Sequence, residues 1–249
     1  MRIRGALHVH STLSHDGTLT IAELAHFYRE RRFHFVALGE HSQDLDESKV
    51  QQMVAECTAH SRPDLCLIPG IEFTCSPPTM HLFAPGCVEL TAARDPLVVA
   101  RHIREQGCLS VLAHPKRLQW NCSPDLLRCL DAVEIWNVGY DGKLAPAGPS
   151  LAAFRGMQQI NPDLLAVASH DLHHKGAFYN VGIEMETGAL TRQEVLDRLR
   201  RGDYRIESLL FRTDSRAATS RAREWYLRAV AQPIRVLRHL RHLFQRYSP

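Results

Sequence analysis

Short apolar runs alternate with amphipathic helical patterns along about 210 residues of this 249-residue chain. The apolar runs lie at 3–7, 35–38, 65–68, 81–83, 109–112, 132–135, 164–168 and 181–184. Hydrophobic residues recur at helical spacing in 21–32, 48–59, 96–106, 123–129, 150–159 and 192–201. This alternation predicts an α/β fold with a mostly parallel sheet and helices outside it. So many units in this length favour a barrel over an open sheet.

Helix-end signals support the same reading. Thr20 precedes the first helical pattern and Glu23 follows three residues later, which predicts a capping box. Gly107 and Gly202 each follow a helical pattern, where a glycine can adopt the left-handed conformation that ends a helix.

Histidines and carboxylates stand at the ends of most apolar runs. In α/β barrels, reactive side chains lie at the carboxyl ends of the strands. The residues found there are His8, His10, Glu40, His41, Glu72, His81, His114, Glu134, Asn137, Asp171 and His173. We therefore expect these side chains to converge at one end of the fold.

Such a set of residue types predicts a metal centre. In a strand, residues two apart face the same side, so His8 and His10 could bind one ion together, and Asp171 and His173 repeat that spacing. Imidazole and carboxylate groups are ligands for Zn²⁺, Mn²⁺ and Fe²⁺. Several carboxylates buried together would be unfavourable unless cations neutralised them.

Five segments of the sequence resemble, in order, the motifs of the PHP (polymerase and histidinol phosphatase) superfamily. They are the segment from His8 to Gly17, Gly39-Glu40-His41, Gly70-Ile71-Glu72, His114-Pro115 and Asp171-Leu172-His173. The match spans residues 1 to about 205. It implies a distorted (β/α)7 barrel, which we expect to occupy residues 1–211 as a metallohydrolase domain. The arginine content and helical spacing of 212–249 predict a C-terminal helical extension after it.

The resemblance also implies a centre of two or three divalent metal ions, Zn, Mn or Fe. His8, His10, Glu72 and Asp171 would hold the first ion, and Glu72 would bridge to a second held by His81 and His114. Asp16, His41 and His173 would hold a third. Glu72, Asp171 and His173 are the expected catalytic residues, and members of the superfamily hydrolyse phosphate esters.

Three positions depart from the superfamily pattern. Glu40 replaces the usual aspartate, which changes its reach to neighbouring groups. His170 replaces the usual small residue, and it could contact substrate or point away. His15, beside Asp16, is an additional candidate ligand.

Cationic and polar residues next to the ligand motifs are candidates for substrate binding. Phosphate recognition needs such contacts. The chain has four lysines, and two of them follow ligand motifs directly. The expected substrate contacts are Lys116, Arg117, Asn137, His170, His174 and Lys175. For each of them, a purely structural or solvated role is the alternative.

Charge is distributed unevenly. Residues 212–249 contain nine arginines against Asp214 and Glu224, whereas the whole chain has a net charge of only +3. Residues 233–247 have the pattern of a basic amphipathic helix. The tail could pack on the body, bind an anionic membrane surface, or contact a nucleic acid or an acidic protein.

The expected compartment is the cytoplasm, with membrane association through 214–249 as the alternative. The seven cysteines form no C-x-x-C pair, which indicates reduced thiols. We see no signal peptide at the start of the sequence.

The leading functional prediction is a metal-dependent phosphoesterase that uses a metal-bridging hydroxide on a small phosphomonoester. The net negative body argues against a processive nuclease, but a short oligonucleotide or nucleotide remains an alternative substrate for a phosphodiesterase or exonuclease. An amidohydrolase-like C–N or ester hydrolase and a non-catalytic metal-binding module are further alternatives. The sequence leaves the metal, the substrate and the oligomeric state open.

Overall fold

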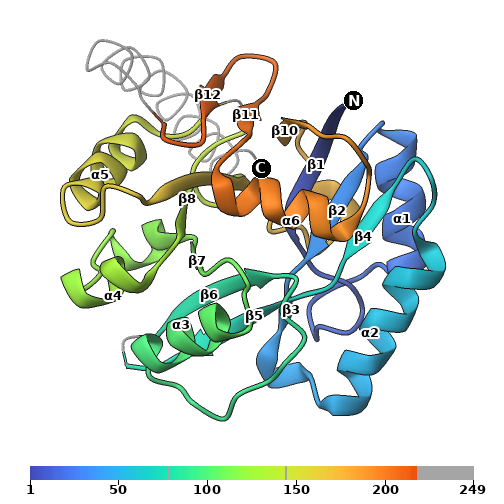
Figure 1. Cartoon of the computed structure of the whole chain (residues 1–249), viewed down its shortest axis with the longest axis horizontal. Coiled ribbons are helices and arrows are strands. Elements are labelled where there is room, and N and C mark those ends of the chain that lie inside the picture. Colours follow the sequence, from blue (N-terminus) through green and yellow to red (C-terminus); the bar gives the residue numbers. More distant parts are fainter. Residues whose placement is uncertain (78, 144, 218–249) are drawn as a thin grey trace, which may run out of the picture.

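The computed structural model describes residues 1–77, 79–143 and 145–217, and in these residues the fold is mixed α/β (Figure 1). Two six-stranded sheets have the orders β12-β11-β10-β1-β2-β4 and β3-β5-β6-β7-β8-β9. The strands are β1 (Arg2–Val9), β2 (Phe35–Leu38), β3 (Glu40–His41), β4 (Cys66–Ile68), β5 (Gly70–Cys75), β6 (Met80–Pro85), β7 (Val111–Ala113), β8 (Ala132–Asn137), β9 (Leu165–Ser169), β10 (Gly182–Glu186), β11 (Arg205–Glu207) and β12 (Arg212–Asp214).

Six α-helices lie between the strands of the described residues. They are α1 (Ile21–Glu30), α2 (Glu47–His60), α3 (Pro96–Glu105), α4 (Pro124–Cys129), α5 (Gly148–Gln158) and α6 (Arg192–Arg201), with short 3-10 helices η1 (Ser42–Asp44), η2 (Pro115–Leu118) and η3 (Lys175–Ala177). The capping box of Thr20 and Glu23 is present, and Gly107 and Gly202 have positive φ angles of 65° and 74° after α3 and α6. The predicted helix-end signals are therefore confirmed.

The expectation of a mostly parallel sheet is corrected by the strand pairing. Five of the ten strand pairs in the described residues are parallel and five are antiparallel. The reason is visible at β5 and β6, which are joined by a short turn and pair antiparallel from Gly70–Pro85 to Cys75–Met80. A parallel pair needs a long crossover connection, and this turn provides none.

The two sheets are joined in two places. Only Gly39 separates β2 from β3, and only Pro69 separates β4 from β5, so each pair continues from one sheet into the other. On the other side, the chain after β9 bonds to β1: the N–H of His170 donates to the carbonyl of Leu7, and the N–H of His10 donates to the carbonyl of Leu172, each at 3.0 Å. The carboxyl ends of β1, β3 and β9 consequently meet.

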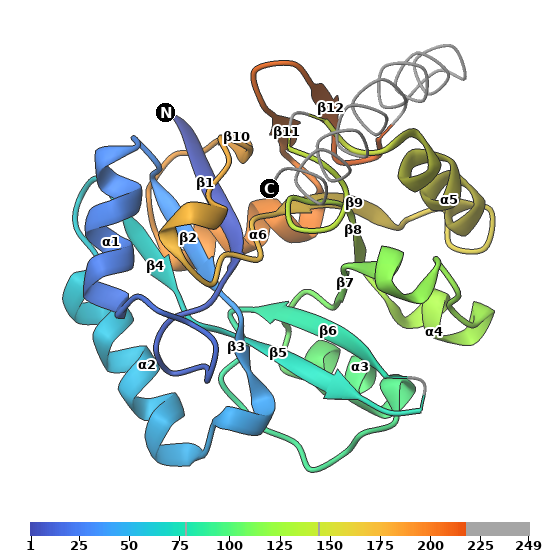
Figure 2. The ribbon, with the colours of Figure 1, turned by 180° about the vertical axis from the view of Figure 1, so that it is seen from behind.

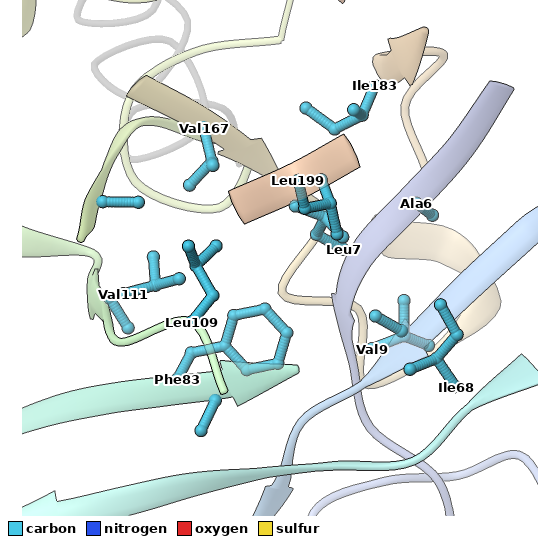
Figure 3. Packing of buried hydrophobic residues seen from close by; sticks show 14 of the residues in the cluster. Ala6, Leu7, Val9, Ile68, Phe83, Leu109, Val111, Val167, Ile183 and Leu199 are labelled. Atoms are coloured by element: carbon cyan, nitrogen blue, oxygen red, sulfur yellow. The ribbon is translucent and has the colours of Figure 1, made fainter. Parts of the chain in front are cut away.

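The core lies between the sheets and the surrounding helices. Figure 3 shows Leu7 of β1, Phe83 of β6, Val111 of β7, Val167 of β9 and Leu199 of α6 within one cluster of buried hydrophobic side chains. Figures 1 and 2 show α1 and α2 beside β2 and β4, and α3 beside β5 and β6. Burial of this kind stabilises the fold by about 25 cal/mol per Å² of apolar surface. The packed core also holds the ends of the strands in fixed positions.

The seven cysteines are free, and four of them are buried. This agrees with the expectation of reduced core thiols. No helix in the described part of the chain has the length and apolar character needed to cross a bilayer.

The boundary expected at residues 211 and 212 falls inside the β11–β12 hairpin. Arg212–Asp214 forms β12 and pairs with Arg205–Glu207, so the start of the expected tail is part of the first sheet. Residues 218–249, including the amphipathic pattern at 233–247, lie outside the described residues.

Candidate metal centre

Nine predicted ligands come from the ends of six strands and the loops that follow them. His8 lies in β1, His41 in β3, Glu72 in β5 and His81 in β6. The remaining five residues, His10, Asp16, His114, Asp171 and His173, lie in the segments after β1, β7 and β9. The structure brings the nine together, as the sequence predicts.

The carboxylate of Glu72 is the centre of this cluster. Its Oε1 lies 2.9 Å from His81 Nδ1, 2.9 Å from His114 Nε2 and 3.3 Å from His8 Nε2. Its Oε2 lies 2.8 Å from His41 Nδ1 and 3.9 Å from His10 Nε2. The side chain is 1% exposed, so Glu72 is a buried carboxylate surrounded by five imidazoles. This position suits a ligand that bridges two ions.

Three groups of donor atoms are close enough to hold an ion each. In each group the ligand atoms lie within 4.8 Å of one another. The groups are His8, His10 and Glu72; Glu72, His81 and His114; and His10, Asp16, His41 and His173. They match the three sets that the resemblance implies with two differences: His10 also joins the third group, and Asp171 is not a member of the first. Asp171 lies beside the first, with its Oδ1 3.5 Å from His10 Nε2.

Unsatisfied ligand atoms give an independent test of whether metal ions fit. Six buried side-chain N or O atoms of the described residues lack a hydrogen-bond partner. Four of them belong to this cluster: His8 Nε2, His10 Nε2, and the pair His41 Nδ1 and Glu72 Oε2, which lie 2.8 Å apart without the alignment of a hydrogen bond. A buried polar atom without a partner is destabilising, and a bound cation would satisfy all four. The residues present therefore fit a metal centre.

Hydrogen bonds at the other ring nitrogens fix the histidines for ligation. His8 Nδ1 lies 2.7 Å from Glu134 Oε1, and His173 Nδ1 lies 3.0 Å from the carbonyl of Asp171. Because these oxygens accept hydrogen bonds, Nδ1 of each ring donates and Nε2 faces the cluster. Burial opposes a charge on His8, but Glu72, Glu134 and Asp171 raise its pKa well above the usual value, so a metal ion at Nε2 would take the place of a proton.

Glu40 sets the position of His10 through Ser14. The Ser14 hydroxyl donates to Glu40 Oε2 at 2.5 Å, and the N–H of Ser11 donates to Glu40 Oε1 at 2.9 Å. The same hydroxyl oxygen lies 3.4 Å from His10 Nδ1. The longer glutamate therefore reaches the loop after β1, which agrees with its expected role beside the ligands.

Burial and the histidines act in opposite directions on the carboxylates. Burial alone would raise the pKa of Glu72, but His8, His114 and His41 hold that pKa well below its usual value. Burial likewise opposes ionisation of Asp171, and His8 and His10 nevertheless lower its pKa. For His10, burial dominates and lowers the pKa to about 4. The site at neutral pH therefore holds anionic carboxylates and a neutral His10, the forms that bind cations.

Three of the ligands have left-handed backbones. The φ angles are 60° at His8, 32° at His114 and 46° at Asp171. Non-glycine residues rarely adopt this region, and they persist there where the surrounding structure enforces it.

Glu134 contacts the cluster directly, although the predicted ligand set omits it. Its Oε1 contacts His8 Nδ1, and its Oε2 accepts the N–H of His114 at 2.7 Å and the amide of Asn137 at 3.0 Å. The Asn137 amide also donates to Asp171 Oδ2 at 3.1 Å. One buried carboxylate thus positions parts of three ligands. Its place at the end of an apolar run was the signal available in the sequence.

We expect Glu134→Gln to weaken metal binding about 10–100-fold, the usual effect of losing a group that orients a ligand. Glutamine has one oxygen instead of two, so its NH₂ group would lie against either the N–H at His8 Nδ1 or the backbone N–H of His114, and one of these two hydrogen bonds would be lost. Titration of the metal-free protein with Zn²⁺ against a chromophoric chelator measures this affinity, with Glu105→Gln at the exposed end of α3 as the matched control. An unchanged affinity in the folded variant would contradict the assigned role.

Gly39 allows His8 to lie close to the backbone between β2 and β3. A Cβ atom at this position would lie 2.7 Å from His8 Cδ2 and 3.1 Å from Phe83 Cδ2. The His8 ring cannot retreat easily, because it is stacked on Phe83 with the ring centroids 4.8 Å apart.

Gly39→Ala is therefore expected to lower the free energy of unfolding by about 1–3 kcal/mol, the usual effect of overpacking, and to weaken metal binding. Gly156→Ala is the matched control, because a Cβ added there meets nothing within 4 Å. In helix α5 that change should stabilise by about 0.5–1 kcal/mol. Urea denaturation of both variants checks the pair, and equal stabilities would argue against the close packing at Gly39.

The residues expected to contact substrate differ in their exposure and in the groups that they contact. Lys116 Nζ donates to the carbonyl of Tyr140 at 2.5 Å and lies 3.7 Å from Asp141 Oδ1, so it holds a loop. Arg117 is exposed, with its guanidinium 5.6 Å from the centroid of the Tyr140 ring. His174 and Lys175 are exposed in the segment after His173.

His170 is placed in the core, which differs from the expected substrate contact. Its Nδ1 lies 2.8 Å from the Tyr28 hydroxyl and its Nε2 lies 2.7 Å from the carbonyl of Val181. Both nitrogens are engaged and the residue is 2% exposed, so the role of His170 is structural. Asn137 is also buried, where it contacts Glu134 and Asp171.

His15 lies outside the cluster. Its Nδ1 pairs with Asp44 Oδ2 at 2.7 Å, and its side chain is 63% exposed. It is absent from the three donor groups of the described residues, so the structure does not support it as a ligand.

Among known proteins, this chain is similar to solved structures that share its fold. No family model matches the sequence, and no curated protein does. The first solved structure is a two-domain protein from Bacteroides vulgatus described as containing a predicted PHP-like metal-dependent phosphoesterase, with 17% identity and a TM-score of 0.58. That similarity covers 83% of this chain and 65% of the other, so the chain spans less than two thirds of that protein.

Two further structures have similar scores. A protein from Bifidobacterium adolescentis described as a metal-dependent phosphoesterase has 16% identity and a TM-score of 0.52, covering 69% of this chain and 88% of its own. A lesion-specific endonuclease from Pyrococcus furiosus has 14% identity and a TM-score of 0.51, covering 82% and 56%. This chain has the fold of the PHP-like metal-dependent phosphoesterases.

Proposed function

We propose that the protein is a metal-dependent phosphoesterase that acts on a small phosphomonoester. The observation that carries the proposal is the convergence of four unsatisfied buried ligand atoms around Glu72. His8, His10, Glu72 and Asp171 would hold the first ion, His81 and His114 would share Glu72 with the second, and Asp16, His41 and His173 would hold the third. We also propose that the ring of strands forms the distorted (β/α)7 barrel that the sequence predicts.

Divalent ions held at these residues supply Lewis acidity and lower the pKa of water, which is the chemistry that phosphate hydrolysis needs. The protein itself supplies the arrangement. Glu134 and Ser14 hold the His8 and His10 rings with their Nε2 atoms toward Glu72. Asn137 holds the Asp171 carboxylate through its Oδ2 and leaves Oδ1 toward the histidines.

Cationic side chains at the exposed edge of the centre would bind the phosphate group. Arg117, His174 and Lys175 are exposed and follow ligand motifs. Within the described part of the chain, the Arg117 guanidinium makes no ion pair, so it is free to meet an anion. Lys116 shapes the loop that carries Tyr140. A small phosphorylated molecule is the partner that this edge suits.

The test combines metal content with substrate class. We expect purified protein to hold two or three Zn, Mn or Fe ions per chain and to hydrolyse p-nitrophenyl phosphate faster than bis(p-nitrophenyl) phosphate and p-nitrophenyl acetate. Elemental analysis and absorbance at the nitrophenolate band measure both. Folded protein that binds no metal would refute the centre, and preferred turnover of the acetate would identify an ester hydrolase.

A phosphodiesterase acting on nucleotides or short oligonucleotides is the second candidate. It is favoured by the fold similarity to a lesion-specific endonuclease. Faster turnover of the bis-ester than of the monoester would support it. The membrane and nucleic-acid roles suggested for 214–249 remain proposals, because 218–249 lies outside the described residues.

A further inference from the structure

Tyr140 places an exposed aromatic ring beside the metal centre. The residue is 42% exposed, and its ring centroid lies 5.4 Å from that of His114. His114 Nε2 in turn lies 2.9 Å from Glu72 Oε1. One imidazole ring therefore separates Tyr140 from the bridging carboxylate. A tyrosine offers an apolar ring face, and a half-exposed ring beside a cluster of buried ionisable groups lies where it can contact a ligand.

The loop that carries Tyr140 is held firmly at its start. The N–H groups of Tyr140 and Asp141 donate to the carbonyl of Asn137 at 3.1 Å and 2.8 Å. Asp141 Oδ2 accepts the N–H of Asn137 at 3.0 Å, and Asp141 Oδ1 accepts the Ser150 hydroxyl at 2.5 Å. These bonds close the backbone of the loop on itself and on α5.

Two longer side chains hold the loop at Tyr140 and Gly142. Lys116 Nζ donates to the carbonyl of Tyr140, and Trp136 Nε1 donates to the carbonyl of Gly142 at 2.7 Å. Trp136 is itself fully buried and packs edge-to-face on Phe211. An aromatic ring on a loop held from both sides is preorganised, which is the property expected of a binding residue and not of a mobile surface side chain.

A planar cation accompanies the ring. The Arg117 guanidinium lies over Tyr140, 5.6 Å from its centroid. Arginine stacks on aromatic faces, and a guanidinium and a phenol together form a platform that favours flat groups over aliphatic ones. The platform lies next to the expected site of the phosphoryl group, where the leaving group of the substrate must extend.

We propose that Tyr140 is a specificity-determining residue that stacks against the leaving group, and that the preferred substrates are phosphomonoesters of planar aromatic alcohols or of molecules with a flat ring near the ester. This inference rests on the proposed phosphoesterase function and names its substrate class. A tenfold preference corresponds to about 1.4 kcal/mol, which lies at the lower end of the ~1–3 kcal/mol contributed by stacking of a flat ring on an aromatic side chain.

The test compares an aromatic and an aliphatic ester in metal-loaded protein. The ratio of kcat/KM for phenyl phosphate to that for ethyl phosphate is measured in the wild type, Tyr140→Phe and Tyr140→Ala. We expect Tyr140→Ala to lower the ratio about tenfold and Tyr140→Phe to retain it, because the ring and not the hydroxyl makes the contact. A ratio that survives in Tyr140→Ala would overturn the inference.

Binding without turnover provides a second readout. Calorimetry with phenylphosphonate and methylphosphonate should give a preference for the phenyl compound that disappears in Tyr140→Ala and persists in Tyr140→Phe. If the wild type hydrolyses both phosphates but Tyr140→Ala keeps its phenyl preference, only the inference fails. If the metal-loaded wild type neither hydrolyses the esters nor binds the phosphonates, the proposed function fails and this inference fails with it.

Discussion

Replacing Glu72 with glutamine is expected to reduce turnover by roughly 10³-fold or more, the scale of losing a central electrostatic group of an active site. Five histidine nitrogens lie 2.8–3.9 Å from its carboxylate, and no other carboxylate among the described residues contacts so many of them. Glutamine keeps the shape but removes the charge and one of the two acceptor oxygens. Two of the three donor groups would lose their shared ligand.

Metal content separates this explanation from misfolding. Elemental analysis should show that Glu72→Gln retains at most one ion per chain, and its circular dichroism should match that of the wild type. Glu105→Gln, at the exposed end of α3, should keep both metal and turnover. Full metal content together with full activity in Glu72→Gln would show that the centre does not depend on a bridging carboxylate.

Removal of the metal ions is expected to abolish turnover and to lower the Tm by about 5–10 °C. A ligand present at 100 times its Kd stabilises the folded state by about 2.7 kcal/mol, and 1 kcal/mol shifts the Tm of a protein of this size by about 2–4 °C. The physical reason is that His8 Nε2 and His10 Nε2 would be left without a hydrogen-bond partner, and His41 Nδ1 and Glu72 Oε2 with only the unaligned contact between them.

Differential scanning fluorimetry after dialysis against EDTA measures the shift, and addition of Zn²⁺ or Mn²⁺ should restore both Tm and turnover. The same treatment of Glu72→Gln should change its Tm much less, since that variant has little metal to lose. A wild-type Tm that is independent of metal would refute a resident centre.

The residues of the centre were predictable because their signal is local. Most of the predicted ligands stand at or just after the end of an apolar run, and the burial of those runs fixes where their ends lie. Asp16 was identified by the resemblance, and it lies within hydrogen-bonding distance of His41 and His173. The α/β class and the helix caps follow from patterns of the same short range.

The direction of the strands and the roles of Glu134 and His170 were not predictable in this way. An apolar run has the same pattern whether its neighbour is parallel or antiparallel, so the hairpin of β5 and β6 could not be distinguished from a crossover. Glu134 depends on residues 126 positions away, and His170 on the hydroxyl of Tyr28, 142 positions away. Contacts between such distant residues depend on tertiary packing, which a local pattern does not encode.

The left-handed backbones of His8, His114 and Asp171 bear on how this protein could change over generations. Glycine or asparagine would adopt the same conformation with less strain, and each such exchange would recover roughly 1–2 kcal/mol. The same exchange at His8 would leave the buried carboxylate of Glu134 without its partner, so the strain and the contacts act in opposite directions on any replacement. The positions that resist change are thus those where a strained backbone and a buried hydrogen bond coincide.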